Sequence, residues 1–450
     1  MVGKRKKSKK GRVTLFSKLL LNSKPTSATI ARARLPAHSM ICHQCDLRTQ
    51  LPPLLPGMEA RCPRCNDALC AIPHAPYEGP LAMATSALCF LILACAFPFL
   101  TMSVQGKVSQ ISLLQSAETL IQQDFAVLAE LLLIFVLVTP LVFLSILIYL
   151  YEGLRQQRKL PGAAFLNRTI AKLKPWMMVD VFMLGVLVSM IKMASYADLS
   201  PGWSFWAFLC FMLTLTRASS MVNAHWLHQQ SARLHAINPL ETEPEEAFGC
   251  KVCGFLSPIT ATQCVHCASP LHHRHPHSLQ ITLALLAAAV IFYLPANLYP
   301  MMVTEALGAT TTSTILQGVV LLWDLGSYPV ALVILIASVF IPMIKMLSIS
   351  LLCLAAWRAQ RGKPLLYTKL YRFTEFIGRW SMVDVFVVAI LVALVQMGSL
   401  MSIYPGTASL SFAVVVILTM LSAMSFDVRL IWDQTQNRTQ SEPSSGIKNG

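Results

Sequence analysis

Long apolar segments alternate with shorter polar segments along most of the chain. A segment needs about 20 apolar residues to cross a bilayer as a helix. The sequence predicts spanning helices near residues 81–101, 127–151, 177–197, 203–222, 279–301, 327–356, 381–401 and 407–425. These helices form two groups of four, which the polar segment 223–278 separates. The pattern predicts an all-α integral membrane protein that contains two four-helix bundles.

The two groups are copies of one module. The heptapeptide Trp-Met-Met-Val-Asp-Val-Phe at 176–182 returns as Trp-Ser-Met-Val-Asp-Val-Phe at 380–386, with the same offset that carries Pro201-Gly202 onto Pro405-Gly406. Such self-similarity at a fixed period indicates a repeat architecture. Four spans per module return the chain to its starting side of the membrane, so we expect parallel rather than inverted repeats.

The pattern divides the chain into six parts. We expect a disordered basic arm at 1–35, a first metal ribbon at 36–75, a four-helix membrane module at 76–222, a linker with a second metal ribbon at 223–278, a second four-helix module at 279–433 and a disordered tail at 434–450. Each module also has a semi-polar loop after its first span, where Ile111-Ser-Leu-Leu-Gln115 parallels Thr314-Ile-Leu-Gln317. An interfacial or re-entrant helix and a docking surface for a periplasmic partner are compatible interpretations of these loops.

Composition supports the membrane assignment and charge gives an orientation. Hydrophobic residues make up 55% of the chain and charged residues 13%, whereas a soluble domain has about 25% charged residues. The formal net charge is +15, but Lys and Arg cluster in the basic arm and in loops 153–175 and 357–379. This placement favours an anionic membrane leaflet over nucleic acid. By the positive-inside rule, both termini and both metal ribbons are expected in the cytoplasm.

Each module is preceded by two Cys-x-x-Cys pairs. The first set is Cys42, Cys45, Cys62 and Cys65, and the second is Cys250, Cys253, Cys264 and Cys267. Two facing pairs supply four thiolates in tetrahedral geometry, which suits a closed, structural Zn²⁺ site. The spacing does not separate zinc from iron. A thioredoxin-like redox pair is disfavoured because no βαβ pattern surrounds any of the pairs.

Ionisable and hydroxyl side chains inside the predicted spans are candidate functional residues, because a charge at bilayer depth costs about 2.5–3.5 kcal/mol. In the second module they are Ser338, Lys345, Ser381, Asp384 and Thr419. Ser338 and Lys345 share one helix face, as do Ser381 and Asp384 on the next helix. A Lys345–Asp384 pair would satisfy the buried ammonium. We expect either a polar pocket or switch, or a static ion pair that fixes the packing.

The first module lacks this set. Asp180 matches Asp384, but alignment of Pro140 with Pro342 places Phe143 where Lys345 would be. The second module is therefore the favoured site. No phosphate-cradling glycine loop of the Walker A type occurs, and we expect a protein that is not an enzyme.

Taken together, the chain resembles the paraquat-inducible protein A family of bacterial inner-membrane proteins. Besides the cysteine pairs, the resemblance rests on His277-Ser-Leu-Gln280 leading to Leu294-Pro-Ala-Asn-Leu298, on Ser313-Thr-Ile-Leu316 to Tyr328-Pro-Val330, and on Gly378-Arg-Trp-Ser-Met-Val-Asp-Val-Phe386. It covers roughly residues 38–433 and leaves out the basic arm.

The resemblance implies an inner-membrane component of an intermembrane lipid transport system. Such a component would load phospholipid into, or receive it from, a tunnel formed by a periplasmic MCE-domain protein. Two other functions remain open. One is a non-transporting membrane anchor or assembly factor for the periplasmic partner, and the other is a membrane redox protein.

Overall fold

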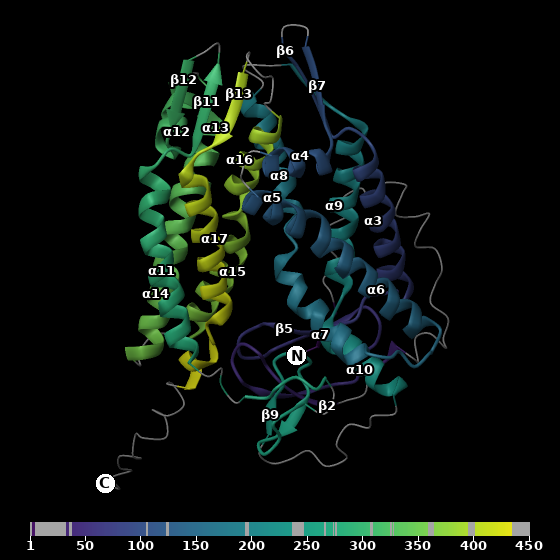
Figure 1. The fold of residues 1–450 in the computed structure, drawn as a ribbon. Helices are drawn as coiled ribbons and strands as arrows, with labels where there is room; N and C mark the ends of the chain where they lie inside the picture. The colour runs from purple at the N-terminus through teal and green to yellow at the C-terminus, as the bar shows by residue number, and fades with distance from the viewer. Residues whose placement is uncertain are drawn as a thin grey trace, which may run out of the picture. The chain divides into compact units, whose positions relative to one another are not determined.

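The chain folds into two compact units (Figure 1). The computed structural model describes residues 2–4, 33–35, 38–104, 107–122, 126–193, 198–235, 247–264, 267–272, 274, 277–306, 309–324, 326, 328–358, 364–394 and 401–433. Unit 1 comprises Met1–Leu88, Leu141–Trp176 and Leu213–Arg274, and unit 2 comprises Cys89–Pro140, Met177–Met212 and His275–Gly450. Each unit therefore combines segments that are far apart in the sequence.

Unit 1 contains the two cysteine ribbons and the helices packed on them. Its strands are β1 (Val2–Lys4), β2 (His38–Ile41), β3 (Arg48–Leu51), β4 (Met58–Arg61), β5 (Ala68–Ala71), β9 (Ala247–Gly249) and β10 (Leu256–Pro258). Its helices are α7 (Ala163–Leu173), the 3₁₀ turn η2 (Lys174–Trp176) and α10 (Ala224–Leu234). Three further helices, α3 (Glu78–Ala96), α6 (Thr139–Arg155) and α9 (Trp203–Met221), are divided between the units.

Unit 2 contains the second membrane module and the remaining parts of the first. From the first module come β6 (Leu100–Val104), β7 (Lys107–Ile111), α4 (Leu113–Gln122), α5 (Ala126–Leu133), the π-helix η1 (Ile134–Val138), α8 (Val179–Met193) and β8 (Asp198–Pro201). The second module contributes α11 (Ser278–Leu298), β11 (Met302–Ala306), β12 (Ala309–Ser313), α12 (Ile315–Asp324), α13 (Tyr328–Leu335), the π-helix η3 (Ile336–Phe340), α14 (Ile341–Arg358), α15 (Pro364–Trp380), α16 (Val383–Leu394), β13 (Met401–Pro405) and α17 (Thr407–Ser425).

The eight predicted spans all have helical counterparts. Among the described residues, seven helical segments are long and apolar enough to cross a membrane, and the bent pair of α9 and α10 raises the number to eight if it counts as one span. The predicted helices in the outer loops are α4 and α12. Each begins with a capping box, since Ser112 and Gln115, like Thr314 and Gln317, bond each other's backbone N–H groups.

Each module also carries a three-stranded antiparallel sheet, which the sequence analysis missed. The strand orders are β7-β6-β8 and β12-β11-β13. In both sheets a tight hairpin supplies two strands, and the third arrives roughly 100 residues later. The all-α expectation therefore holds for the spanning segments, but these sheets have to be added to it.

Glycine is required at one position beside each sheet. A Cβ built on Gly202 would lie 2.1 Å from the Pro98 carbonyl oxygen, and one on Gly406 would lie 2.0 Å from the Pro300 oxygen. Both contacts are with backbone atoms, which cannot swing away as a side chain can. The repeated Pro-Gly dipeptides thus mark the point where the third strand turns into the last helix of each module.

The two copies of the repeated heptapeptide meet inside unit 2. Phe182 on α8 and Phe386 on α16 pack edge to face, with ring centroids 5.6 Å apart. Gly185 permits this approach, because a Cβ there would lie 3.1 Å from the Cβ of Phe386. The two copies of the heptapeptide are therefore in direct contact through α8 and α16.

The termini differ in part from the prediction. Residues 2–4 of the expected disordered arm form β1, which pairs antiparallel with β4 of the first ribbon, so the prediction is wrong for these residues. Residues 5–32 of the arm and the tail from residue 434 lie outside the described residues.

Candidate functional site

The eight cysteines form four knuckles of the same local geometry. In each knuckle the N–H of the residue after the second cysteine bonds the carbonyl oxygen of the first. The four residues at this position, Asp46, Asn66, Gly254 and Ala268, all have positive φ, between 51° and 76°. Asp, Asn and Gly tolerate this region well, whereas an alanine is strained there. The knuckle backbone is thus set by local sequence.

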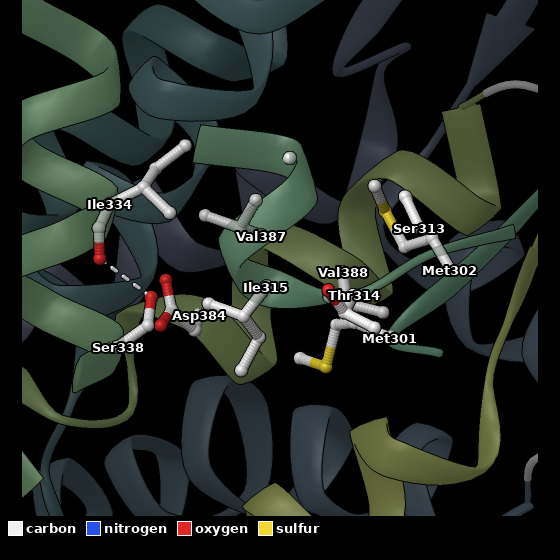
Figure 2. Close-up of a pocket in the computed structure, with 11 residues that line it drawn as sticks. Met301, Met302, Ser313, Thr314, Ile315, Ile334, Ser338, Asp384, Val387 and Val388 are labelled. Carbon is white, nitrogen blue, oxygen red and sulfur yellow. Dashed lines mark hydrogen bonds between the residues drawn. The ribbon is translucent and has the colours of Figure 1, made fainter. Parts of the chain in front are cut away.

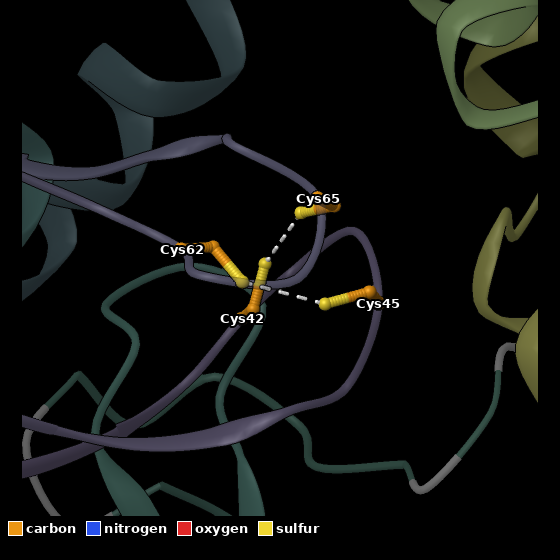
Figure 3. Close-up of side chains that lie close together, drawn as sticks. All are labelled: Cys42, Cys45, Cys62 and Cys65. Atoms are coloured by element: carbon orange, nitrogen blue, oxygen red, sulfur yellow. Dashed lines mark hydrogen bonds between the residues drawn. The ribbon is translucent and has the colours of Figure 1, made fainter. Parts of the chain in front are cut away.

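The four thiols of each ribbon converge on one point. Figure 3 shows the side chains of the first ribbon pointing toward one another. In this ribbon the Cys42–Cys65 and Cys45–Cys62 sulfur atoms are 3.5 Å apart, and the corresponding pairs of the second ribbon have the same separation. Tetrahedral sulfur ligands at about 2.3 Å from an ion would be about 3.8 Å apart. The buried cysteines therefore form two groups that can hold a metal ion.

The electrostatics of the clusters favour a bound cation. Hydrogen bonds from Cys42 and Cys45 lower the pKa of Cys65 to about 2, whereas hydrogen bonds to Cys45 and Cys65 raise the pKa of Cys42. In the second ribbon the neighbouring thiols lower the pKa of Cys250 and raise that of Cys253. Each cluster stabilises a first thiolate and opposes the next one, which is the charge problem that a divalent ion removes.

The ribbons pack on each other and on α10. His225 of α10 lies 2.7 Å from the carbonyl oxygen of Cys253 through Nδ1 and 2.7 Å from His38 through Nε2. Its ring also packs on Phe255. Desolvation by burial lowers the pKa of His225 to about 3. A neutral imidazole thus connects strand β2 of the first ribbon with a ligand residue of the second.

Of the six polar residues predicted as a pocket or switch, the structure brings two together. Ser338 and Asp384 line a cavity of about 50 Å³ between α12, η3 and α16 (Figure 2). Both side chains are buried, and the Ser338 hydroxyl donates to the carbonyl oxygen of Ile334 at 2.7 Å. Such a volume holds a few water molecules or one small polar group. Ser338 and Asp384 are therefore polar positions in a mostly apolar wall.

A π-helix shapes the wall of this cavity. Ser338 lies in η3, whose last N–H, that of Ile341, bonds Ile336 instead of the residue four positions back. Pro342 follows directly, and its missing N–H interrupts the regular helical pattern. The first module has the equivalent π-helix η1 before Pro140, with Val136 at the position of Ser338. The backbone feature is thus duplicated, but its polar lining is not.

The predicted Lys345–Asp384 pair is not formed. Lys345 is 1% exposed, and its Nζ makes no hydrogen bond within the described part of the chain. Instead the side chain lies against Gly378 of α15, where an added Cβ would be 3.4 Å from Nζ. Sequence spacing placed Lys345 on the same helix face as Ser338, but α14 turns this face toward α15 beyond the π-helix. The ion-pair prediction is therefore wrong.

The remaining three candidates are separate from the cavity. Ser381 is buried with no hydrogen-bond partner for its Oγ among the described residues, and the Thr419 hydroxyl bonds the carbonyl oxygen of Val416. Asp180, the counterpart of Asp384, is exposed in the first turn of α8. The predicted asymmetry concerned the missing counterpart of Lys345, and the structure adds a difference in exposure between Asp180 and Asp384.

Comparison with known proteins identifies the family. Two segments, residues 77–232 and 279–436, match the family model of paraquat-inducible protein A. The chain belongs to the paraquat-inducible protein A family. The resemblance inferred from the sequence is confirmed, and each membrane module is one copy of the unit that defines the family.

Several relatives match most of the chain. The chain is 41% identical over 404 residues to the Intermembrane transport protein PqiA of Escherichia coli strain K12. The aligned region covers 88% of this chain and 96% of the relative. It is 29% identical to the Lipophilic envelope-spanning tunnel protein A of the same strain, over 87% of this chain and 90% of the relative. A Probable intermembrane transport protein of Haemophilus influenzae is 28% identical over 87% of this chain and 95% of the relative. No solved structure matches the chain.

Some residues of the site were beyond sequence reasoning. Gly318 lines the cavity, and a Cβ built on it would meet nothing within 4 Å. His38 and His225 lie 187 residues apart in the chain, yet they hold the two ribbons together. The parallel between the outer loops predicted a helix at α12, but no sequence signal showed that this helix lies at the cavity of Ser338 and Asp384.

Proposed function

We propose that this protein is the inner-membrane component of an intermembrane lipid transport system. It passes phospholipid to or from a tunnel formed by a periplasmic MCE-domain protein. The observation that carries the proposal is the partly open cavity of Ser338 and Asp384, a mostly apolar space whose wall contains these two polar side chains. The names of two relatives, which refer to intermembrane transport and to an envelope-spanning tunnel, support the same function.

The cavity suits the polar end of a lipid rather than its chains. Its volume of about 50 Å³ is too small for an acyl chain, so the chains lie along the apolar helix surfaces outside it. The Asp384 carboxylate and the Ser338 oxygen supply hydrogen-bond acceptors for donors of a head group, since the Ser338 O–H is already bonded to Ile334. Lys345 and Ser381, both buried close to the link between α15 and α16, form a second polar position that responds when a lipid enters. Thr419 and Asp180 contribute to lipid handling from positions outside the cavity.

The four-cysteine ribbons hold structural Zn²⁺. All four positions of each cluster are filled by buried protein thiols, which leaves no open coordination position for catalysis. Zinc suits this donor set, and its lack of redox chemistry agrees with a protein that is not an enzyme. Metal analysis of the purified protein tests this assignment, and iron in place of zinc would overturn it.

The orientation follows from charge. The Lys- and Arg-rich loops 153–175 and 357–379 face the cytoplasm together with both termini and both ribbons. The sheets β7-β6-β8 and β12-β11-β13 then face the periplasm, where the MCE-domain partner docks. Cysteine accessibility to a membrane-impermeant reagent in whole cells tests this orientation, with single cysteines placed in β12 and in α7.

Gly318 offers a direct test of the cavity. Gly318→Phe fills the open space beside Ser338 and Asp384, whereas Gly318→Ala leaves most of it free and is the matched control. Native mass spectrometry of gently extracted protein measures the bound phospholipid. We expect the wild type and Gly318→Ala to retain one more bound lipid than Gly318→Phe. Equal lipid binding in all three proteins would overturn the cavity as the lipid site.

A membrane anchor for the periplasmic partner is the alternative function. The outer sheets favour it, because β12 and β7 lie at sheet edges and can receive another strand. Co-purification of the MCE-domain protein separates the two functions. If Gly318→Phe and Lys345→Ala lose lipid transfer but retain the partner, transport is supported. Transfer that is unchanged in both variants would favour the anchor.

A further inference from the structure

A second cavity lies within unit 1, where the first ribbon meets the end of α9. Its volume is about 310 Å³, which is within the usual range of small-molecule sites, about 300–1,000 Å³. Residues 57–59 and 71–75 of the ribbon form one wall, and residues 217–223 form the other. The function proposed above does not use this cavity, and none of the residues predicted as a lipid pocket lines it.

The polar groups that line this cavity are mostly hydrogen-bond donors. Arg217 and His74 are exposed, and within the described part of the chain their side chains form no ion pair or hydrogen bond. Asn223 uses its Oδ1 to accept from the N–H of Trp226 and from the Cys70 thiol, so its amide nitrogen remains to donate. An arginine, an imidazole and an amide N–H₂ around one space match an oxyanion.

The acidic residue of the lining does not cancel this positive character. Glu59 forms an ion pair with Arg61 at 3.0 Å, outside the residues that line the cavity. The Glu59 charge is thereby balanced by Arg61. The guanidinium of Arg217 remains as the uncompensated charge of the cavity.

The ribbon wall is held in place by a glycine. Gly57 has φ of +87°, and a Cβ on it would lie 2.5 Å from Cε1 of His74. The imidazole thus rests directly on the Gly57 backbone. Gly57 is itself anchored, because its N–H donates to the carbonyl oxygen of Ile72 at 2.8 Å. His74 therefore has a defined position at the cavity even though it is exposed.

The position in the chain points to a lipid rather than to a free anion. Arg217 lies four residues before the end of α9, which is about 6 Å along a helix. It is thus at the level where a spanning helix meets lipid head groups. Apolar side chains of Met58, Ile72, Met221 and Val222 complete the lining, and they suit the glycerol and upper acyl carbons. Basic pockets beside spanning helices are typical sites for anionic phospholipids.

We propose that this cavity, with Arg217, His74 and Asn223 around it, binds the phosphate of an anionic phospholipid head group. The bound lipid fastens the first ribbon to the end of α9. Inorganic phosphate has the same chemistry, and the test below separates the two sources.

The test is a titration of the full-length, metal-loaded protein in neutral detergent with dioctanoyl phosphatidylglycerol, followed by native mass spectrometry. The background is Gly318→Phe, so that the cavity of Ser338 and Asp384 does not contribute. Arg217→Gln should weaken binding about tenfold, the scale of one charged hydrogen bond, and His74→Gln should weaken it less. Arg158→Gln, which removes an exposed charge of the same unit away from the cavity, is the matched control and should bind as the parent does.

Two outcomes would overturn the proposal. If Arg158→Gln and Arg217→Gln weaken binding equally, the lipid responds to diffuse surface charge and not to this cavity. If inorganic phosphate displaces the lipid at equal concentration, the site takes free phosphate and not a lipid. Because Arg217 and His74 are exposed, neither variant should unfold the protein, and an unchanged metal content verifies this.

Discussion

The positive φ at Ala268 makes a sharp prediction about the second ribbon. Ala268 has φ of 51°, whereas the equivalent residue of the preceding knuckle is Gly254 at 76°. An L-residue in this region costs about 1–2 kcal/mol, and the greater freedom of glycine in the unfolded chain offsets about half of that. Ala268→Gly should therefore stabilise the metal-bound ribbon by about 1 kcal/mol. The reverse change, Gly254→Ala, should destabilise it.

The size of the Gly254→Ala effect follows from its neighbours. A Cβ on Gly254 would lie 2.5 Å from the methyl carbon of Met40 and 3.1 Å from Nδ1 of His225. Met40 can swing aside, but His225 is held by its contact with Cys253. Backbone strain and crowding together should destabilise the ribbon by about 2–3 kcal/mol. The contact with Met40 also lies between the two ribbons, so the first ribbon should be affected as well.

Metal release measures both effects, since metal affinity and folding of such small domains are coupled. The purified protein is mixed with excess chromophoric chelator, and the two phases of metal transfer are followed. Ala268→Gly should slow the phase of the second ribbon about fivefold, and Gly254→Ala should accelerate it by a factor of about 30 or more. Ala261→Gly, in the same ribbon but without positive φ, is the control and should accelerate release slightly. If Ala268→Gly accelerates release as Ala261→Gly does, the common knuckle geometry is refuted.

Three further predictions concern other parts of the molecule. Lys345→Met replaces a buried ammonium that makes no hydrogen bond within the described part of the chain. The variant should unfold with a free energy about 1–3 kcal/mol higher than the wild type, while lipid transfer falls. A lower stability would show that the ammonium has a stabilising partner. Gly406→Ala places a Cβ against the Pro300 carbonyl oxygen and should destabilise the second module by about 2–4 kcal/mol in thermal unfolding. Gly318→Ala is the control and should not destabilise it. If the two variants are equally stable, the close approach at Gly406 is contradicted. Burial raises the pKa of Cys70 to about 12, so between about pH 7 and 9 its alkylation should be far slower than that of an ordinary thiol. Its rate should still rise with pH above about 9, where the rate of an ordinary thiol with a pKa of about 8.5 levels off; a plateau near pH 9 would contradict the raised pKa.

Sequence reasoning succeeded where the signal is local or periodic. The spans, the repeat and the cysteine clusters are each encoded within a short window, and the described residues contain all three. The sheets were missed because their strands have four or five residues and pair with partners about 100 positions away. Strands this short carry too little alternation to be recognised inside semi-polar loops.

The candidate site shows the same limit. Ser338 and Asp384 were predicted to be close, and they share one cavity. Lys345 was predicted to join them because it lies seven residues after Ser338, but helical spacing assumes 3.6 residues per turn. The π-helix η3 changes that count between the two residues and sends Lys345 toward Gly378. Arg217 and His74 are 143 positions apart, so only the folded ribbon brings them to the same cavity.

The contact between Phe182 and Phe386 has a consequence for the history of the chain. The two copies of the duplicated module pack against each other through equivalent residues, so the same contact could join two separate chains that each carried one module. Joined in one chain, the two copies differ at this face. One copy kept an exposed aspartate at 180, and the other buried its equivalent at 384 beside a serine. A half-length protein built from either module should still find a partner through this face, and the heterodimer of the two halves would reconstitute the present molecule from separate genes.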